Sequence, residues 1–148
     1  MKTTRLVGVV PLEGNRLLTC FETGEVRLCD FETLCRELPG VSVLRDSELF
    51  ARFEIDANGR ELVWPGCCRI SQQKLAALGE RLPLRQEDFI RFCQDQLLST
   101  AEAAQMLRCT RQNIDSLVRR ERLHPVKCYA KNKIFLKSDI LRRMWDLN

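Results

Sequence analysis

The chain has 148 residues, of which 45% are hydrophobic and 30% charged, and its formal net charge is +4. No apolar run approaches the ~20 residues that a membrane-spanning helix needs. The short apolar stretch after Arg5 is interrupted by Pro11 and Glu13, which is unlike a signal peptide. We therefore expect a cytoplasmic protein with no membrane partner.

The first half of the chain is predicted to form short strands joined by tight turns. Apolar, β-branched and aromatic residues are frequent in segments 6–11 and 16–22, and Thr23-Gly24 then precedes an alternating stretch, 25–31. Asn58-Gly59 lies between two further apolar runs, which is a strong short-range hairpin signal. A domain built on β-hairpins follows from these patterns.

Two helices and a domain boundary are predicted next. Ser71 begins a short helix that ends near Gly79, and Pro83 marks the boundary. Beyond it, segment 85–97 carries apolar residues at spacings of three and four, which places them on one helical stripe that could pack on either domain. The residues of this stripe are Phe89, Phe92, Cys93 and Leu97.

Positive charge is concentrated in the second part of the chain. From Arg85 onward there are thirteen basic and eight acidic residues, whereas the preceding part has eleven basic and twelve acidic ones. Nearly all of the excess follows Arg108. A basic region of this kind is the electrostatic pattern expected of a nucleic-acid-binding domain.

A pair of short helices is predicted within this basic region. Ser99 and Glu102 have the spacing of a capping box, which indicates a helix start. Ala103 and Ala104 would let a second helix cross closely, because their side chains are small. Thr110 is positioned to cap that second helix, which would run to about residue 120. Two short, tightly crossed helices match the helix-turn-helix plan.

In a helix-turn-helix, the N-terminal residues of the second helix face the major groove. Arginine pairs there with guanine, and Gln or Asn with adenine, whereas other basic residues contact phosphates. The predicted base-reading residues are Arg111, Gln112, Asn113 and Ser116. The predicted contacts to the DNA backbone are Thr110, Arg119, Arg120 and Arg122, with Lys131, Asn132 and Lys133 in the segment that follows.

A β-hairpin and a last helix are predicted after the second helix. Segments 125–129 and 134–136 flank a basic polar turn, 130–133, which would form a wing with a positive tip. Ser138-Asp139 would then cap a helix whose apolar residues pack back on the motif. These apolar residues are Ile140, Leu141 and Trp145.

Three segments of this region, 98–107, 110–114 and 137–140, resemble the excisionase and MerR-like winged helix-turn-helix family. The resemblance implies a major-groove contact from the second helix and a minor-groove or backbone contact from the wing. That family often has glycine where this chain has Arg108 and Glu121. We therefore expect these two tight turns to be reshaped.

The first half, in segments 9–11, 17–27, 49–51 and 62–66, resembles the bacterial domain of unknown function 2442 family. This resemblance implies a small α+β domain with no assigned chemistry, and some relatives carry a helix-turn-helix after it. Members are also often found beside another small protein. That neighbourhood suggests antitoxin-like pairing and hence a small protein partner.

No metal, cofactor or catalytic site is predicted. The chain has eight cysteines but no Cys-x-x-Cys pair, and His124 is its one histidine, so we expect reduced thiols and no structural metal. Vicinal Cys67-Cys68 could respond to oxidants, but we favour inert thiols. The carboxylates of Asp30, Asp56 and Glu61 lack a positioned histidine, a nucleophile motif or a glycine-rich phosphate loop. We therefore expect no enzyme.

Together these patterns predict a bacterial DNA-binding transcription regulator of the α+β class. An α+β domain over residues 1–82 would precede an α-helical winged helix-turn-helix domain over residues 83–148. The main alternative is a protein-interaction module, an antitoxin-like or phage accessory factor, whose helix-turn-helix docks a protein. A single small motif usually binds double-stranded DNA weakly, so a homodimer on paired half-sites is expected.

Overall fold

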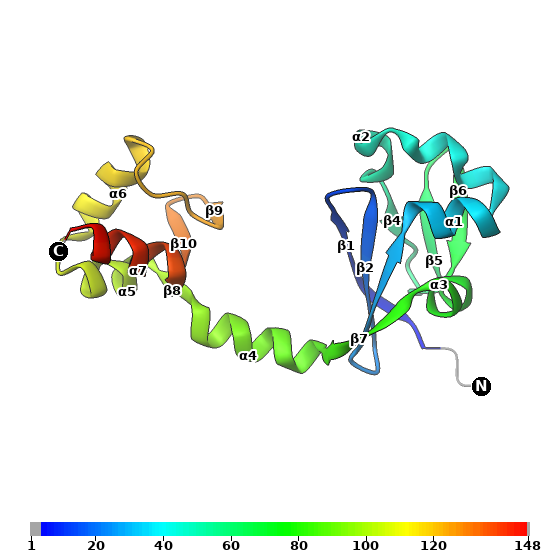
Figure 1. Ribbon diagram of the computed structural model, residues 1–148, viewed down its shortest axis with the longest axis horizontal. Coiled ribbons are helices and arrows are strands. Elements are labelled where there is room, and N and C mark those ends of the chain that lie inside the picture. Colours follow the sequence, from blue (N-terminus) through cyan, green and yellow to red (C-terminus); the bar gives the residue numbers. More distant parts are fainter. Residues whose placement is uncertain (1–3, 148) are drawn as a thin grey trace. The chain divides into compact units, whose positions relative to one another are not determined.

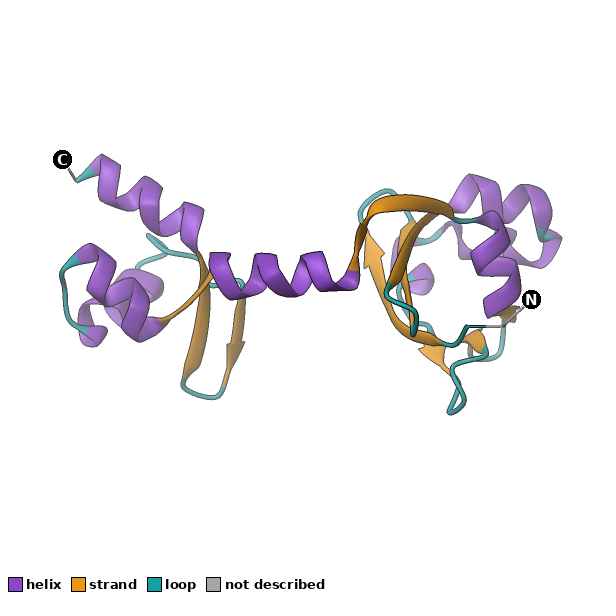
Figure 2. Ribbon diagram, turned by 90° about the horizontal axis from the view of Figure 1, so that it is seen from below, coloured by secondary structure: helices purple, strands orange, loops and turns teal. Residues whose placement is uncertain are grey.

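The computed structural model describes residues 4–147 and divides the chain into two compact units, Met1–Phe89 and Ile90–Asn148. Both units combine helices with antiparallel strands (Figures 1 and 2), so the expected α+β class is confirmed. Among the described residues, no helix is both long enough and apolar enough to cross a membrane.

The main sheet of the first unit has four antiparallel strands in the order β1-β2-β3-β7. The predicted hairpin at Gly24 is confirmed, because β2 and β3 pair from Cys20 with Val26 onward and Gly24 has φ of 88°. Leu17 and Val26 are fully buried on this sheet. Its strands are β1 (Leu6–Leu12), β2 (Arg16–Phe21), β3 (Glu25–Asp30) and β7 (Glu80–Arg85).

A second, three-stranded sheet contains β4 (Glu54–Ile55), β5 (Glu61–Trp64) and β6 (Cys68–Ser71). The predicted Asn58-Gly59 hairpin joins β4 to β5. Gly59 has φ of 69°, and a Cβ there would lie 2.6 Å from the carbonyl oxygen of Leu6. This turn therefore requires glycine both for its backbone conformation and for its close approach to β1.

The helices of the first unit begin at side-chain caps that the sequence supplies. Asp30 caps α1 by accepting a hydrogen bond from the Thr33 N–H at 2.7 Å, and Ser71 caps α3. Around a core that contains Phe50 and Trp64 lie α1 (Phe31–Glu37), the 3-10 helix η1 (Pro39–Arg45), α2 (Ser47–Phe50) and α3 (Gln72–Leu78).

The first unit extends beyond the predicted boundary after Leu82. Strand β7 pairs with β3 through Arg81 and Arg85, so Pro83 lies inside a strand of the first unit. Pro83 does not break the first unit, because β7 is an edge strand, where the missing N–H of proline is tolerated. The division between the units comes after Phe89 instead.

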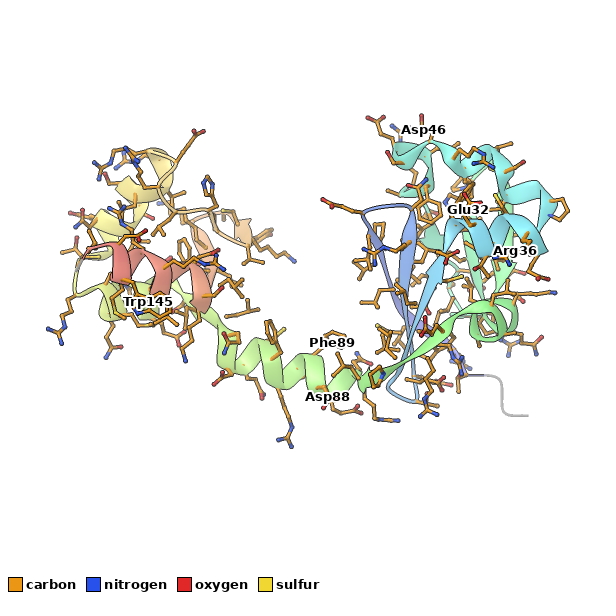
Figure 3. All side chains as sticks on the ribbon, viewed as in Figure 1. Glu32, Arg36, Asp46, Asp88, Phe89 and Trp145 are labelled. Atoms are coloured by element: carbon orange, nitrogen blue, oxygen red, sulfur yellow. The ribbon has the colours of Figure 1, made fainter. Side chains whose placement is uncertain are left out.

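The predicted helix is present as α4 (Gln86–Gln96). It ends one residue before Leu97, so three of the four predicted stripe residues lie on it, and none of the three is buried. Phe92 is 54% exposed and Cys93 is also exposed, while Phe89 is half-buried. Figure 3 shows Asp88 and Phe89 projecting from α4 in different directions. The spacing identified which residues share a face, but it carries no information on whether another element covers that face.

The second unit contains β8 (Leu97–Ser99), α5 (Thr100–Leu107), α6 (Arg111–Arg119), β9 (Lys127–Tyr129), β10 (Asn132–Leu136) and α7 (Lys137–Asp146). Its three strands pair in the order β8-β10-β9. Strand β8 was not predicted, because three residues are too few to show a period. The core of this unit consists of Leu98, Ala103, Ala104, Ile114, Leu117, Leu123, Phe135 and Ile140.

The predicted capping box is confirmed. The Ser99 hydroxyl accepts a hydrogen bond from the Glu102 N–H, the Glu102 carboxylate accepts one from the Ser99 N–H, and both distances are 3.1 Å. Ala103 is fully buried and Ala104 is 6% exposed, as the close crossing of α5 and α6 requires. Thr110 caps α6 by accepting from the Asn113 N–H at 3.1 Å.

The tight turns after α5 and α6 keep the left-handed backbone conformation that glycine favours. Arg108 has φ of 54° and Glu121 has φ of 57°. The expected reshaping of these turns does not occur. Instead, two residues with side chains adopt a conformation that costs about 1 kcal/mol or more per residue.

The last helix differs from its prediction at both ends. Leu136 is the N-cap of α7 and makes no side-chain capping bond, so Ser138 and Asp139 lie in the first turn and are not caps. Ile140 is fully buried, as expected. Trp145, labelled in Figure 3, is 61% exposed and does not pack on the motif.

Candidate nucleic-acid interface

The first turn of α6 presents polar side chains to solvent. Arg111, Gln112 and Asn113 are exposed, whereas Ile114 and Leu117 face the core with 0% and 7% exposure. This separation follows from the helical period, which places residues 114 and 117 on one face. The exposed turn is therefore free to contact a ligand while the buried face holds the helix.

A hollow of about 530 Å³ lies between the start of α5, the start of α6 and the β9–β10 hairpin. It brings together four of the predicted DNA contacts, Arg111, Lys131, Asn132 and Lys133. Three cationic side chains line this hollow against one carboxylate, so its net charge is positive. The remaining lining residues are Ser99, Thr100, Ala101, Asp115 and Ile134.

An ion pair connects the hairpin to α6 at this hollow. The Lys133 Nζ lies 3.0 Å from the Asp115 Oδ1, and the two side chains are 21% and 47% exposed. Lys133 therefore has a partner inside the unit. Because hairpin and helix are tied at this point, their polar groups form one surface.

The tip of the hairpin differs slightly from the predicted turn. Asn132 pairs with Tyr129 and Lys133 pairs with Cys128, so Asn132 and Lys133 belong to strand β10. The turn therefore consists of Ala130 and Lys131 alone. Ala130 has φ of 54°, which is the backbone conformation that two-residue hairpin turns require at their first position. Lys131 is exposed at the tip.

The predicted arginines at the end of α6 lie apart from this hollow. Helix α6 spans nine residues, so Arg111 and Arg119 are about 12 Å apart along its axis. The Arg120 Nε donates to the Ser116 carbonyl oxygen at 3.5 Å. Arg122 lines a different hollow, of about 370 Å³, with Arg142 and Arg143 of α7 among its other residues.

The other predicted base-reading residues do not line the hollow. Gln112 and Asn113 are exposed beside Arg111 on the first turn of α6, and Ser116 is half-buried one turn later. Thr110 is exposed, but its hydroxyl already serves the helix cap. Of the predicted set, the groups that share the hollow are Arg111 on α6 and Lys131, Asn132 and Lys133 on the hairpin.

Sequence reasoning missed the role of Asp115 and of the start of α5 in this site. Asp115 lies four residues after Arg111, and that spacing places both on one helix face. This signal was available in the sequence. By contrast, nothing local to segment 99–101 indicates that it lies beside the hairpin, because that proximity depends on the pairing of β8 with β10.

Within residues 4–147, no group of three or more His, Cys, Asp or Glu side chains is placed to hold a metal ion.

No family model matches the chain, and no curated protein matches it. A crystal structure from Nitrosomonas europaea, described as a "Putative DNA Binding Protein", is 22% identical and aligns over 96% of this chain and 84% of its own length, with a TM-score of 0.43. A likeness of this degree does not establish a shared fold.

Proposed function

We propose that the second unit is a winged helix-turn-helix that binds double-stranded DNA and that the protein is a transcription regulator. The observation that carries this proposal is the positive hollow, where Arg111 at the start of α6 and Lys131 at the hairpin tip lie on one surface. In this arrangement α5 and α6 are the two helices of the motif, and the β9–β10 hairpin is the wing.

Base recognition in this proposal belongs to the first turn of α6. The major groove is about 12 Å wide and admits one helix, whose N-terminal side chains then reach the base edges. Arg111, Gln112 and Asn113 have the exposure and the hydrogen-bonding groups that this role needs. Ser116 is half-buried, so it contributes less than these three.

Contacts to the DNA backbone are divided between the wing and the end of α6. Lys131 at the exposed hairpin tip supplies a point charge for phosphate, with Asn132 beside it. Arg119, Arg120 and Arg122 are exposed as well, and they lie farther along the helix and beyond it. Lys133 acts mainly through Asp115, because its ammonium group is already paired.

A selection experiment tests the proposal. The full chain is incubated with random duplexes near physiological salt, and bound DNA is sequenced over several rounds. We expect enrichment of a short motif by the natural protein and loss of that motif by the Arg111→Ala/Gln112→Ala variant. Binding without any enriched motif would show that DNA recognition is not sequence-specific, and absence of binding would reject the proposal.

The matched control for this selection changes the same residue types in the first unit. Arg52→Ala/Gln73→Ala alters two exposed side chains outside the second unit. We expect it to enrich the same motif as the natural protein. The spacing of half-sites within an enriched motif would also show whether the protein binds as a homodimer.

The exposed apolar residues favour a second candidate, in which the same unit docks a small protein partner. Tyr129 on the hairpin is 79% exposed and Phe92 on α4 is 54% exposed. Large exposed apolar side chains are common at protein interfaces. Size-exclusion chromatography with light scattering, with and without the product of a neighbouring gene, distinguishes a complex of this kind from a DNA-only function.

A further inference from the structure

Two adjacent cysteines lie at the turn between β5 and β6 in the first unit. The Cys67 N–H donates to the Trp64 carbonyl oxygen at 3.0 Å, and Gly66 has φ of 71°. With Pro65 before that glycine, this is the residue pattern of a type II turn. Cys68 is the first residue of β6 and pairs with Trp64, so both cysteines sit on a hydrogen-bonded frame.

The two sulfur atoms converge, with the Cys67 Sγ 3.7 Å from the Cys68 Sγ. Adjacent side chains in a regular strand point to opposite faces and would hold their sulfurs apart. Here Cys67 belongs to the turn and Cys68 to the strand, which permits the close approach. Cys67 is exposed and Cys68 is half-buried, so the pair is accessible from solvent on one side.

We propose that Cys67 and Cys68 form a two-sulfur chelating site for a thiophilic metalloid in its trivalent state, such as arsenic(III). Soft thiol ligands select soft ions of this kind. The fixed turn already holds both sulfurs together, which lowers the entropy cost of binding. This site goes beyond the proposed DNA-binding function and does not depend on it.

The number of available ligands favours a metalloid over zinc at this position. Structural zinc is almost always held by four protein ligands. Within the described residues 4–147, no third Cys, His, Asp or Glu joins this pair in a metal-binding group. A trivalent organoarsenical needs only two protein sulfurs, because carbon occupies its remaining position.

Binding of an arsenic(III) oxide proceeds as a condensation in which no atom is oxidised or reduced. Two As–S bonds form, the As–O bonds break, and the two thiol protons leave with the oxygen as water. Burial and the neighbouring Cys67 raise the pKa of Cys68 to about 11, so this thiol is protonated at neutral pH. Cys68 therefore supplies one of the two protons of the water that is released.

Intact-mass spectrometry of the full chain with phenylarsine oxide tests the site. We expect one adduct per chain, with the mass of phenylarsine oxide less one water, that survives glutathione and is removed by 1,2-ethanedithiol. In Cys67→Ser or Cys68→Ser, the remaining single thiol should bind about a hundredfold more weakly. Circular dichroism of each variant verifies its fold, and exposed Cys67 tolerates serine even if Cys68→Ser unfolds.

The matched controls are Cys93→Ser and Cys128→Ser, which remove the two other exposed thiols. Both should keep the glutathione-resistant adduct at the level of the natural protein. Absence of an adduct on the natural protein, or an adduct that persists in Cys67→Ser, would overturn the proposal.

Discussion

Lys133 of β10 and Asp115 of α6 form an ion pair with 3.0 Å between Nζ and Oδ1. The two residues are 18 positions apart in the chain, and the pair joins the hairpin to the helix beside the positive hollow. It also neutralises the carboxylate of Asp115 on a surface that we propose to face phosphates. The pair therefore both positions the wing and removes an unfavourable charge.

The Asp115→Asn substitution should increase affinity for DNA and steepen its salt dependence. Without the carboxylate, Lys133 is free to neutralise a phosphate. Each added phosphate contact makes the slope of log K against log salt more negative by about 0.9. Fluorescence anisotropy with one labelled duplex at several salt concentrations measures the slope.

Lysine variants provide the comparison for this measurement. Lys131→Ala should make the slope of log K against log salt shallower by about 1 and weaken binding equally for all sequences. Lys133→Ala should weaken binding more than Lys131→Ala, because it leaves the Asp115 carboxylate unpaired near DNA. Equal behaviour of Asp115→Asn and the natural protein would show that the pair lies away from the nucleic acid.

Gln112→Ala should relax base preference without changing the salt slope. A bidentate amide contact discriminates against the wrong base by about 1–3 kcal/mol, whereas glutamine carries no charge to release counterions. Competition between the selected duplex and single-base variants measures the preference. Arg119→Ala is the control with the opposite expectation. It should weaken binding to all duplexes alike and make the salt slope shallower, without changing base preference.

Local features of the fold could be predicted from the sequence because a few neighbouring residues determine them. The Asn58-Gly59 hairpin and the Ser99–Glu102 capping box depend on backbone conformations and hydrogen bonds within four residues. The first turn of α6 was predicted for the same reason, since Thr110 and the apolar period define its start and its exposed face.

Features that depend on distant contacts were not predictable in this way. Strand β8 exists because it pairs with β10, and β7 belongs to the first unit because it pairs with β3. The Lys133–Asp115 pair likewise depends on the hairpin returning to α6. On α4 the helical period identified Phe89, Phe92 and Cys93 as one stripe, but it did not show that Leu97 belongs to β8 or that Phe92 remains exposed.

Arg108→Gly should stabilise the second unit by about 1 kcal/mol. Arg108 has φ of 54°, a conformation that costs residues with a Cβ about 1–2 kcal/mol and glycine almost nothing. Part of this gain is offset because glycine is more flexible in the unfolded chain. Native-state hydrogen exchange of the α5 and α6 amides measures the change.

The matched control for that substitution is Gln105→Gly, at an exposed position inside α5. It should destabilise the same amides by about 1 kcal/mol, because glycine is unfavourable in a helix interior. Destabilisation by both substitutions would show that the Arg108 side chain contributes more than its backbone strain costs.

Trp64→Phe should destabilise the first unit by about 1–3 kcal/mol, because it leaves the buried carbonyl of Phe50 without its donor. The Trp64 Nε1 donates to that oxygen at 2.9 Å, and its side chain is 1% exposed and packs against the rings of Phe50 and Phe53. Hydrogen exchange of the β5 amides measures the loss. Trp145→Phe is the control, because Trp145 is 61% exposed and its replacement should change stability by less than about 0.5 kcal/mol. A similar small change for both tryptophans would show that the Phe50 carbonyl finds another donor once the indole is removed.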